Sequence, residues 1–391
     1  MFTPSVEELE KRLKILQDNL QKEEITGALI LSNVNLYYYS GLIEPACFFV
    51  PATGHAVYLT RKRGPLPTDL PWLVRRFKRW GDIIEVLQEF NYPAPGMLGL
   101  EYEKIPASVY LKLKEIALEF SDVTLLIRNQ RAVKSEWEIS VLRETAVRDK
   151  VLWEMVPELL QKAKTDHELA GMFEGEARRR GHAGILRLHG FNQEMSLTCI
   201  LVDEKGNVPS SYDAPLSGAG VSPAFPFGPS GAKLEQGKPI LIDFGGCYFG
   251  YVVDQTRIFM FNTVPPEVKK AYDTAVHILK DLEKMAKPGV VCGELYDHAH
   301  KIASESGIPG FMGSHGGVSF IGHGVGLEID ELPVLARGSQ QRLQAGMVLA
   351  IEPKFTLPGI GAVGLETSYE VTQNGLVSLS TLTDELVVVE K

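Results

Sequence analysis

Cysteine is scarce in this 391-residue sequence, in which Cys47, Cys199, Cys247 and Cys292 are widely spaced and form no CxxC pair. A thiolate zinc site needs clustered cysteines, and a disulfide framework needs many of them in a short chain. The sequence therefore argues against both, and we expect four buried free thiols.

Long hydrophobic runs are also absent. The apolar runs have the length of strands and fall well short of the roughly 20 residues that a membrane helix needs. Residues 1–8 lack the basic and apolar regions of a signal peptide. We therefore expect a cytoplasmic protein without a membrane partner.

Positive charge is in deficit, because 40 Lys and Arg residues face 49 Asp and Glu residues and the formal net charge is −9. Phosphate contacts need a basic excess, so we expect no nucleic-acid partner. A local basic cluster either binds an anion or a subunit or, as is commoner for such runs, forms a solvated face. Its members are Arg61, Lys62, Arg63, Arg75, Arg76, Lys78 and Arg79.

The length of the chain predicts two domains, since single cores rarely exceed about 250–300 residues. Strand and helix patterns alternate up to about Ile127, which predicts a self-contained α/β domain over residues 1–128. Residues 129–134 look like a connection, and residues 129–391 then form the second domain. There we expect helices over 136–160, 266–285 and 293–306, and strands over 196–202, 240–245, 251–261, 348–352, 362–371 and 386–389.

Local signals predict the elements of the first domain. Ser5 and Glu8 have capping-box spacing at the start of an amphipathic helix. We expect strands over 27–32, 47–50, 56–60, 82–87 and 97–100, and helices over 71–80 and 107–118.

Residues 240–257 contain two β-branched and aromatic runs joined by a glycine-flanked turn around Tyr248 and Phe249, which is typical of a β-hairpin. If the hairpin is symmetric about this turn, Asp243 and Asp254 lie directly opposite each other, with Cβ atoms about 5 Å apart. Two acids so close repel each other unless a cation lies between them.

A second hairpin repeats this arrangement, with Glu352 and Glu366 placed evenly about Gly359. Between the two hairpins, His323 stands in a glycine-rich segment that lets its imidazole approach closely. Oxygen ligands with one nitrogen suit Mn, Fe, Co or Zn, and bridging carboxylates hold two metals roughly 3.5–4 Å apart. The sequence therefore predicts a site for two divalent metal ions.

Five motifs in this order resemble the pita-bread metallopeptidases: Ile242-Asp-Phe-Gly, Asp254-Gln-Thr-Arg, Gly322-His-Gly-Val-Gly-Leu, Ile351-Glu-Pro-Lys and Leu365-Glu. That family includes Xaa-Pro dipeptidases, aminopeptidases P, methionine aminopeptidases and the metal-free creatinases. The resemblance covers essentially the whole chain. It implies an α+β fold, in which a pita-bread catalytic domain follows a smaller, creatinase-like N-terminal α/β domain, and it implies a homodimer.

The resemblance also implies a role for each site residue. Asp243 would ligate one metal, Asp254 and Glu366 would bridge both metals, and His323 and Glu352 would complete the second. A hydroxide shared by the two ions would be the nucleophile. Glu352 would also take and deliver the proton, as a catalytic residue.

The chain departs from the proline-specific relatives at several positions. Three of their histidines are missing, from the stretch Ala224-Phe-Pro-Phe227 and from the positions of Ser319 and Asp330. Gly364 stands where some relatives have Arg. These groups hold the substrate and stabilise the tetrahedral intermediate in the family. Asp330, His315 and His189 are the candidates to replace them in part.

The leading interpretation is a dinuclear metal-dependent hydrolase that resembles Xaa-Pro dipeptidase and aminopeptidase P and cleaves a small peptide or related amide. The missing histidines motivate an alternative, in which the same scaffold and metals serve a lyase or another small-molecule amide hydrolase. A third interpretation is a binding protein that retains the site without turnover.

Overall fold

The computed structural model describes residues 3–64, 70–90, 92, 96–115, 119–313 and 317–391. The chain divides into two compact units, Met1–Gln130 and Arg131–Lys391. Each unit has its own sheets and its own hydrophobic core.

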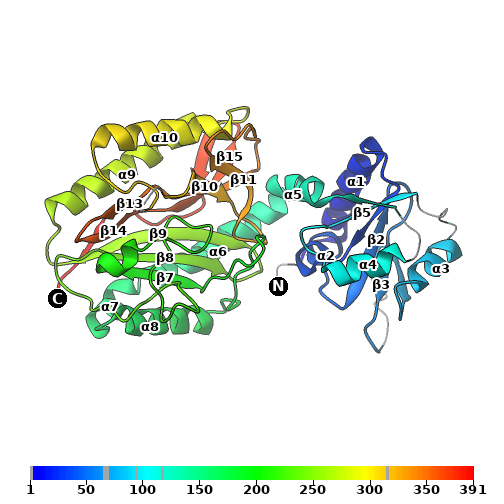
Figure 1. Cartoon of the computed structure of the whole chain (residues 1–391), viewed down its shortest axis with the longest axis horizontal. Coiled ribbons are helices and arrows are strands. Elements are labelled where there is room, and N and C mark those ends of the chain that lie inside the picture. Colours follow the sequence, from blue (N-terminus) through cyan, green and yellow to red (C-terminus); the bar gives the residue numbers. More distant parts are fainter. Residues whose placement is uncertain (1–2, 65–69, 91, 93–95, 116–118, 314–316) are drawn as a thin grey trace. The chain divides into compact units, whose positions relative to one another are not determined.

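A six-stranded sheet with the order β4-β3-β2-β1-β5-β6 forms the centre of the first unit (Figure 1). Strands β1, β2 and β3 pair antiparallel, and the remaining neighbours pair parallel. The strands are β1 Gly27–Ile30, β2 Ala46–Pro51, β3 Val57–Thr60, β4 Leu73–Arg76, β5 Met97–Leu100 and β6 Glu119–Asp122. The helices are α1 Val6–Lys22, α2 Asn33–Ser40, α3 Asp82–Glu89 and α4 Ala107–Lys114.

Two predictions for the first unit are wrong, because a predicted helix contains a strand and a predicted strand lies in a helix. Residues 71–80, expected to be helical, contain strand β4, and residues 82–87, expected to be a strand, lie in helix α3. Ile83, Val86 and Leu87 follow helical spacing and form the buried face of α3. The Asp82 carboxylate, in the first turn of this helix, accepts the backbone N–H groups of Lys78 and Arg79 at 2.8 and 2.9 Å and so fixes the turn that precedes it.

Other predictions for this unit are confirmed, including helix α1, where Ser5 Oγ accepts the N–H of Glu8 at 3.2 Å. The helix expected over 107–118 ends at Lys114, and residues 116–118 lie outside the described residues.

Residues 129–134, expected to be a connection, belong largely to helix α5 (Thr124–Ala132). Asp122 caps this helix by accepting both the N–H and the hydroxyl of Thr124. The helix expected over 136–160 is two helices, α6 (Glu136–Trp153) and α7 (Val156–Lys162). Pro157, in the first turn of α7, explains the break, because proline lacks an N–H and its ring clashes with the carbonyl of residue i−4.

Within residues 131–313 and 317–391, the second unit contains three sheets. One has the order β17-β9-β8-β7, a second the order β11-β10-β12-β15-β16, and β13 pairs with β14. The strands are β7 Thr198–Val202, β8 Ile240–Cys247, β9 Val252–Phe261, β10 Phe320–Gly324, β11 Glu331–Ala336, β12 Val348–Ile351, β13 Lys354–Leu357, β14 Gly361–Gly364, β15 Thr367–Thr372, β16 Gly375–Ser378 and β17 Val387–Val389.

Helices cover the strands of the second unit on two faces (Figure 1). On one face, α9 (Pro266–Met285) and α10 (Cys292–Ser306) enclose the larger hydrophobic core. On the opposite face, α7 and α8 (Asp166–Arg179) pack on β7, β8 and β9. A short 3-10 helix, η1 (Asp203–Asn207), follows β7. The layers hold the strands that carry the site residues.

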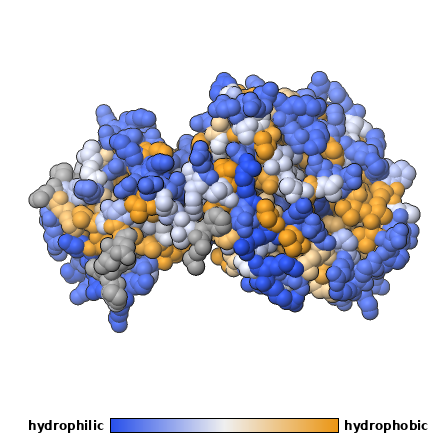
Figure 2. All heavy atoms as spheres, turned by 180° about the vertical axis from the view of Figure 1, so that it is seen from behind, coloured by the Kyte–Doolittle hydropathy of each residue, from blue (hydrophilic) through white to orange (hydrophobic). Residues whose placement is uncertain are grey.

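The four cysteines are buried and free, as predicted. Burial raises the pKa of Cys247 and of Cys292 to about 11, so these thiols stay protonated near neutral pH. Figure 2 shows one face of the molecule, where hydrophobic residues are interspersed among hydrophilic ones. Among the described residues, no helix has the length and apolar character that crossing a membrane requires.

A buried ion-pair network stabilises the second unit. Arg131 Nη2 lies 2.9 Å from Glu328 Oε2 and 2.5 Å from Glu331 Oε1, and Lys134 Nζ lies 3.1 Å from Glu331 Oε2. Burial alone would raise the pKa of Glu331, but Arg131 and Lys134 outweigh it and hold that pKa below its usual value. Glu331 is therefore a carboxylate that two cations share.

We expect Glu331→Gln to lower the free energy of unfolding by about 3–5 kcal/mol, because it leaves two buried cations without their shared partner. Urea denaturation of both proteins measures this change. Asp18→Asn is the matched control, since Asp18 pairs with Lys14 at an exposed site and such pairs contribute about 0–1 kcal/mol. Equal losses in the two variants would contradict the assignment.

Candidate metal centre

The first acidic hairpin consists of β8 and β9. Cys247 pairs with Val252, so the loop is residues 248–251, and Asp243 pairs with Thr256 while Asp254 pairs with Gly245. The predicted register, with Asp243 opposite Asp254, is wrong by two residues because this four-residue loop is not centred on 248 and 249. A shift of two residues keeps every side chain on its face. Both carboxylates therefore still line one pocket.

The second acidic hairpin has the predicted register. Ile351 pairs with Thr367, and Lys354 pairs with Gly364. Glu352 and Glu366 lie between these two pairs, opposite each other and at equal distances along the chain from Gly359.

Glu366 also joins the two hairpins through its backbone. Its N–H donates to the Thr256 carbonyl at 3.1 Å, and its carbonyl accepts the Thr256 N–H at 3.2 Å. The Thr256 hydroxyl donates to Glu366 Oε2 at 2.9 Å, and Arg257 Nη1 donates to the Glu366 carbonyl at 2.6 Å. Glu366 is thus held from both its backbone and its side chain.

His323 lies on β10 between β11 and β12. A Cβ at Gly322 would lie 2.4 Å from the Ala350 carbonyl oxygen, and one at Gly324 would lie 2.1 Å from that of Leu332. Glycine on both sides therefore lets the strands approach closely around the imidazole. His323 Nε2 lies 3.7 Å from Glu352 Oε1.

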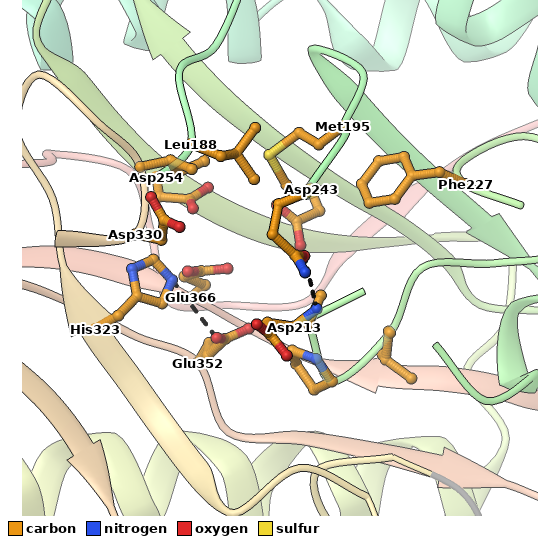
Figure 3. A pocket seen from close by; sticks show the side chains of 15 residues that line it. Leu188, Met195, Asp213, Phe227, Asp243, Asp254, His323, Asp330, Glu352 and Glu366 are labelled. Atoms are coloured by element: carbon orange, nitrogen blue, oxygen red, sulfur yellow. Dashed lines mark hydrogen bonds and ion pairs between the residues drawn. The ribbon is translucent and has the colours of Figure 1, made fainter. Parts of the chain in front are cut away.

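The structure brings all five predicted ligand residues to one pocket, which is lined by Asp243, Asp254, His323, Glu352 and Glu366 together with Asp330 (Figure 3). Asp254, His323 and Glu366 each offer a ligand atom within 4.8 Å of the others. Asp254 Oδ1 and Glu366 Oε1 are buried without a hydrogen-bond partner. Buried polar atoms are normally satisfied, so these oxygens fit a bound divalent ion.

The acids of this pocket affect one another. Burial raises the pKa of Asp254 well above its usual value, and the charges of Glu366 and Asp243 raise it further. Burial also raises the pKa of Asp243, where Glu366 adds to the effect and Lys354 opposes it. The pocket therefore favours any cation that removes this repulsion.

Sequence reasoning missed Lys354. Its Nζ donates to Asp243 Oδ2 and Glu352 Oε2 at 2.8 Å and to Glu366 Oε2 at 2.9 Å. Burial alone would lower the pKa of Lys354, but the three carboxylates raise it well above its usual value, so Lys354 is an ammonium. The available signal was strand alternation, since a residue two positions after Glu352 points to the same face.

Asp330 lines the pocket but already has partners. Its Oδ1 accepts the N–H of His189 at 2.7 Å, and its Oδ2 accepts that of Gly190 at 3.2 Å. The His189 imidazole lies beside Glu328, with 3.5 Å between Nδ1 and Oε2. Asp330 thus fixes the segment at 189–190, whereas His315 lies outside the described residues.

An apolar wall faces the acidic side of the pocket. Phe227 lines the pocket with Leu188 and Met195, and Phe225 packs against Phe227 with 6.3 Å between ring centroids. In Figure 3, Phe227 lies across the pocket from His323 and Asp254. The pocket can therefore hold an apolar group beside the acidic cluster.

Two hairpins bring four carboxylates together, and β10 adds one imidazole. With a separate α/β unit before them, they define a two-domain metallopeptidase fold. The chain belongs to metallopeptidase family M24, whose model matches residues 140–373. Residues 12–133 match the creatinase/prolidase N-terminal domain. The predicted family and its α+β fold are confirmed, as is a peptidase-type hydrolase.

Known proteins resemble the chain over nearly its whole length. It is 27% identical to the Xaa-Pro dipeptidase of Pyrococcus horikoshii over 97% of this chain and 99% of that protein, and 26% identical to that of Pyrococcus furiosus, with the same coverage. Among solved structures, the dipeptidase PepE from Mycobacterium ulcerans has a TM-score of 0.79 at 21% identity, covering 99% of each chain. The prolidase from Pyrococcus horikoshii OT3 has a TM-score of 0.77 at 24% identity, covering 96% of this chain and 100% of that one.

Loss of one carboxylate at the candidate centre should remove bound metal. We expect Asp254→Asn and Glu366→Gln each to strip at least one ion, because both residues offer an unpaired buried oxygen. Elemental analysis after gel filtration measures the metal content. Asp273→Asn, at an exposed ion pair with Lys269 on α9, is the control, and unchanged metal in both site variants would count decisively against the centre.

Metal should also stabilise the fold, because binding to the native state alone adds free energy by linkage. At a free metal concentration about 100 times Kd the gain is about 2.7 kcal/mol, which raises the melting temperature by roughly 5–10 °C. Differential scanning calorimetry with and without chelator measures this shift. Identical melting curves after confirmed metal loss would contradict the expectation, and Glu366→Gln should show a reduced shift.

Proposed function

We propose that the chain is a divalent-metal-dependent hydrolase that cleaves small peptides at the pocket shared by the two acidic hairpins. The observation that carries this proposal is the convergence of Asp254, His323 and Glu366 within 4.8 Å, in a chain of metallopeptidase family M24. A divalent ion supplies Lewis acidity toward a carbonyl oxygen and activates a water molecule. Carboxylate oxygens with one imidazole nitrogen suit Mn, Co, Fe or Zn.

Glu352 is the residue proposed to move the proton. It is only 3% exposed and lines the pocket beside the three proposed ligands. Its Oε2 accepts from Lys354 at 2.8 Å, which orients the carboxylate, and its Oε1 lies on the side of His323. A carboxylate so oriented can take a proton from the attacking water and deliver it to the leaving amine.

The charge around the pocket favours a substrate with a free amino group. Asp213 and Asp330 line it in addition to the proposed ligands, and its described lining contains no Lys or Arg. An ammonium group is attracted to such a site. Phe227, Leu188 and Met195 supply an apolar wall for a neighbouring side chain. We therefore infer a short peptide with a free amino terminus and an apolar residue.

A second candidate is hydrolysis or elimination on a non-peptide amide, with the same residues and metal. It is favoured by the described lining of the pocket, in which His323 is the single histidine. Ser319, which stands at one of the missing histidine positions, is exposed, and its carbonyl accepts the N–H of Arg337. A pocket with few donors stabilises a tetrahedral oxyanion poorly.

We expect the metal-loaded protein to cleave Xaa-Pro dipeptides at least about 10²–10³-fold more slowly than a relative that carries the histidines, because the loss of one donor alone can cost that factor. Steady-state kinetics on a dipeptide panel, with an Xaa-Pro dipeptidase that carries the three histidines as reference, measures the ratio. N-acetylated dipeptides should react more slowly still. Equal rates on Xaa-Pro dipeptides would refute the expectation, and turnover confined to a non-peptide amide panel would favour the second candidate.

We also infer, from the family resemblance, that the protein is a homodimer and, from the sequence, that it is cytoplasmic. Manganese is the first metal to test. Light scattering on the purified protein measures the oligomeric state, and subcellular fractionation measures the location.

A further inference from the structure

Lys354 places a cation inside the candidate metal centre. An ammonium has three donors, and those of Lys354 all reach carboxylates: Asp243 and Glu352 at 2.8 Å and Glu366 at 2.9 Å. Its side chain is 2% exposed, so water does not screen these contacts. The ammonium thus has the oxygen environment that a metal ion would have there.

Gly364 keeps the lysine in this position. It pairs with Lys354 across the β13–β14 ladder. A Cβ at residue 364 would lie 2.7 Å from Lys354 Cα, 2.8 Å from Lys354 Cγ and 2.4 Å from the Pro353 carbonyl oxygen. The absent side chain at 364 therefore makes room for the lysine stem.

The carboxylate oxygens divide into two groups. Asp243 Oδ2, Glu352 Oε2 and Glu366 Oε2 contact the Lys354 ammonium. Among the described residues, Asp254 Oδ1 and Glu366 Oε1 remain without a hydrogen-bond partner. Asp254 and Glu366 also form, with His323, the group whose ligand atoms lie within 4.8 Å of one another. Glu366 thus has one oxygen on the ammonium and one oxygen without a partner.

We propose that Lys354 takes the place of one of the two metal ions that the family resemblance implies, so that this chain binds a single divalent ion, at Asp254, His323 and Glu366. This inference rests on the proposed metal-dependent function and concerns the number of ions. A second ion would compete with the ammonium for Asp243 and Glu366, and two cations in contact repel strongly where water is excluded. The ammonium is tethered to the chain, so it is present whatever the metal concentration.

The proposal also has a consequence for substrate. Four carboxylates balanced by one ammonium and one divalent ion keep a net negative charge, which a substrate ammonium group can neutralise. The built-in cation thus agrees with the preference for a free amino terminus inferred above.

The first test is the metal content of the wild-type protein. After saturation with Mn²⁺ and gel filtration, elemental analysis should find about one ion per chain, whereas a two-metal centre would hold about two. Electron paramagnetic resonance should show an isolated Mn²⁺ ion and not a spin-coupled pair.

The second test removes the lysine. In Lys354→Ala the ammonium is lost and space opens among the three carboxylates, so the content should rise to about two ions per chain, as in two-metal centres. Lys354→Gln, which keeps a side chain of similar length, is the second variant in case the first folds poorly. Lys134→Ala is the matched control, since Lys134 is equally buried but pairs with Glu331 at 3.1 Å. This control should keep the wild-type metal content, and circular dichroism checks the folding of each variant.

Each outcome decides between the claims. One ion in the wild type and two in a folded Lys354 variant support the proposal. Two ions in the wild type overturn it and leave the proposed function intact, and a folded variant that stays at one ion overturns it as well. No ion in the wild type, with ions in the variants, means that the ammonium excludes metal altogether, which overturns the single-ion site. No ion in any of these proteins sinks the proposed function itself.

Discussion

Repulsion among four carboxylates that share one buried pocket is the constraint on which the second unit depends. Asp254, Glu352 and Glu366 are each at most 5% exposed, so solvent cannot screen their charges. The Lys354 ammonium and the Thr256 hydroxyl reduce this repulsion by donating to Glu366 Oε2. The hydrophobic layers of α9 and α10 on one face, and of α7 and α8 on the other, hold the strands against the repulsion that remains.

Much of the candidate site could be predicted from strand periodicity and motif order. A period of two residues determines which side chains share a face, so Glu352 and Glu366 were placed correctly about Gly359. By the same rule, the prediction that Asp243 and Asp254 share a face holds although their register is wrong, because an error of two residues leaves both side chains on the pocket face. The register itself depends on the shape of the loop at residues 248–251, which the sequence does not determine.

The errors have two causes: a distant contact outweighs the local signal at β4, and local signals are overlooked at Pro157 and Lys354. Strand β4 has only four residues, and it forms because its backbone pairs with β3. The break between α6 and α7 was readable from Pro157. The motif around Glu352 predicts a role for that glutamate only, although Lys354, two residues later, points to the same face of the strand. Only its three carboxylate contacts in the structure reveal its role, since a lysine in a strand is usually solvated.

The position of Asp330 limits how this scaffold can be redesigned. Because its two oxygens hold the backbone N–H groups of His189 and Gly190, a histidine introduced at 330 would leave these two donors unmatched and free the segment that carries Leu188 to the pocket wall. The adjacent Glu331 is tied to Arg131 and Lys134, so the backbone has little freedom to adjust. Grafting a proline-specific pocket onto this chain therefore requires a rebuilt 188–190 segment together with the new histidine. A series of single substitutions toward that pocket would pass through variants in which the 188–190 segment is no longer held in place.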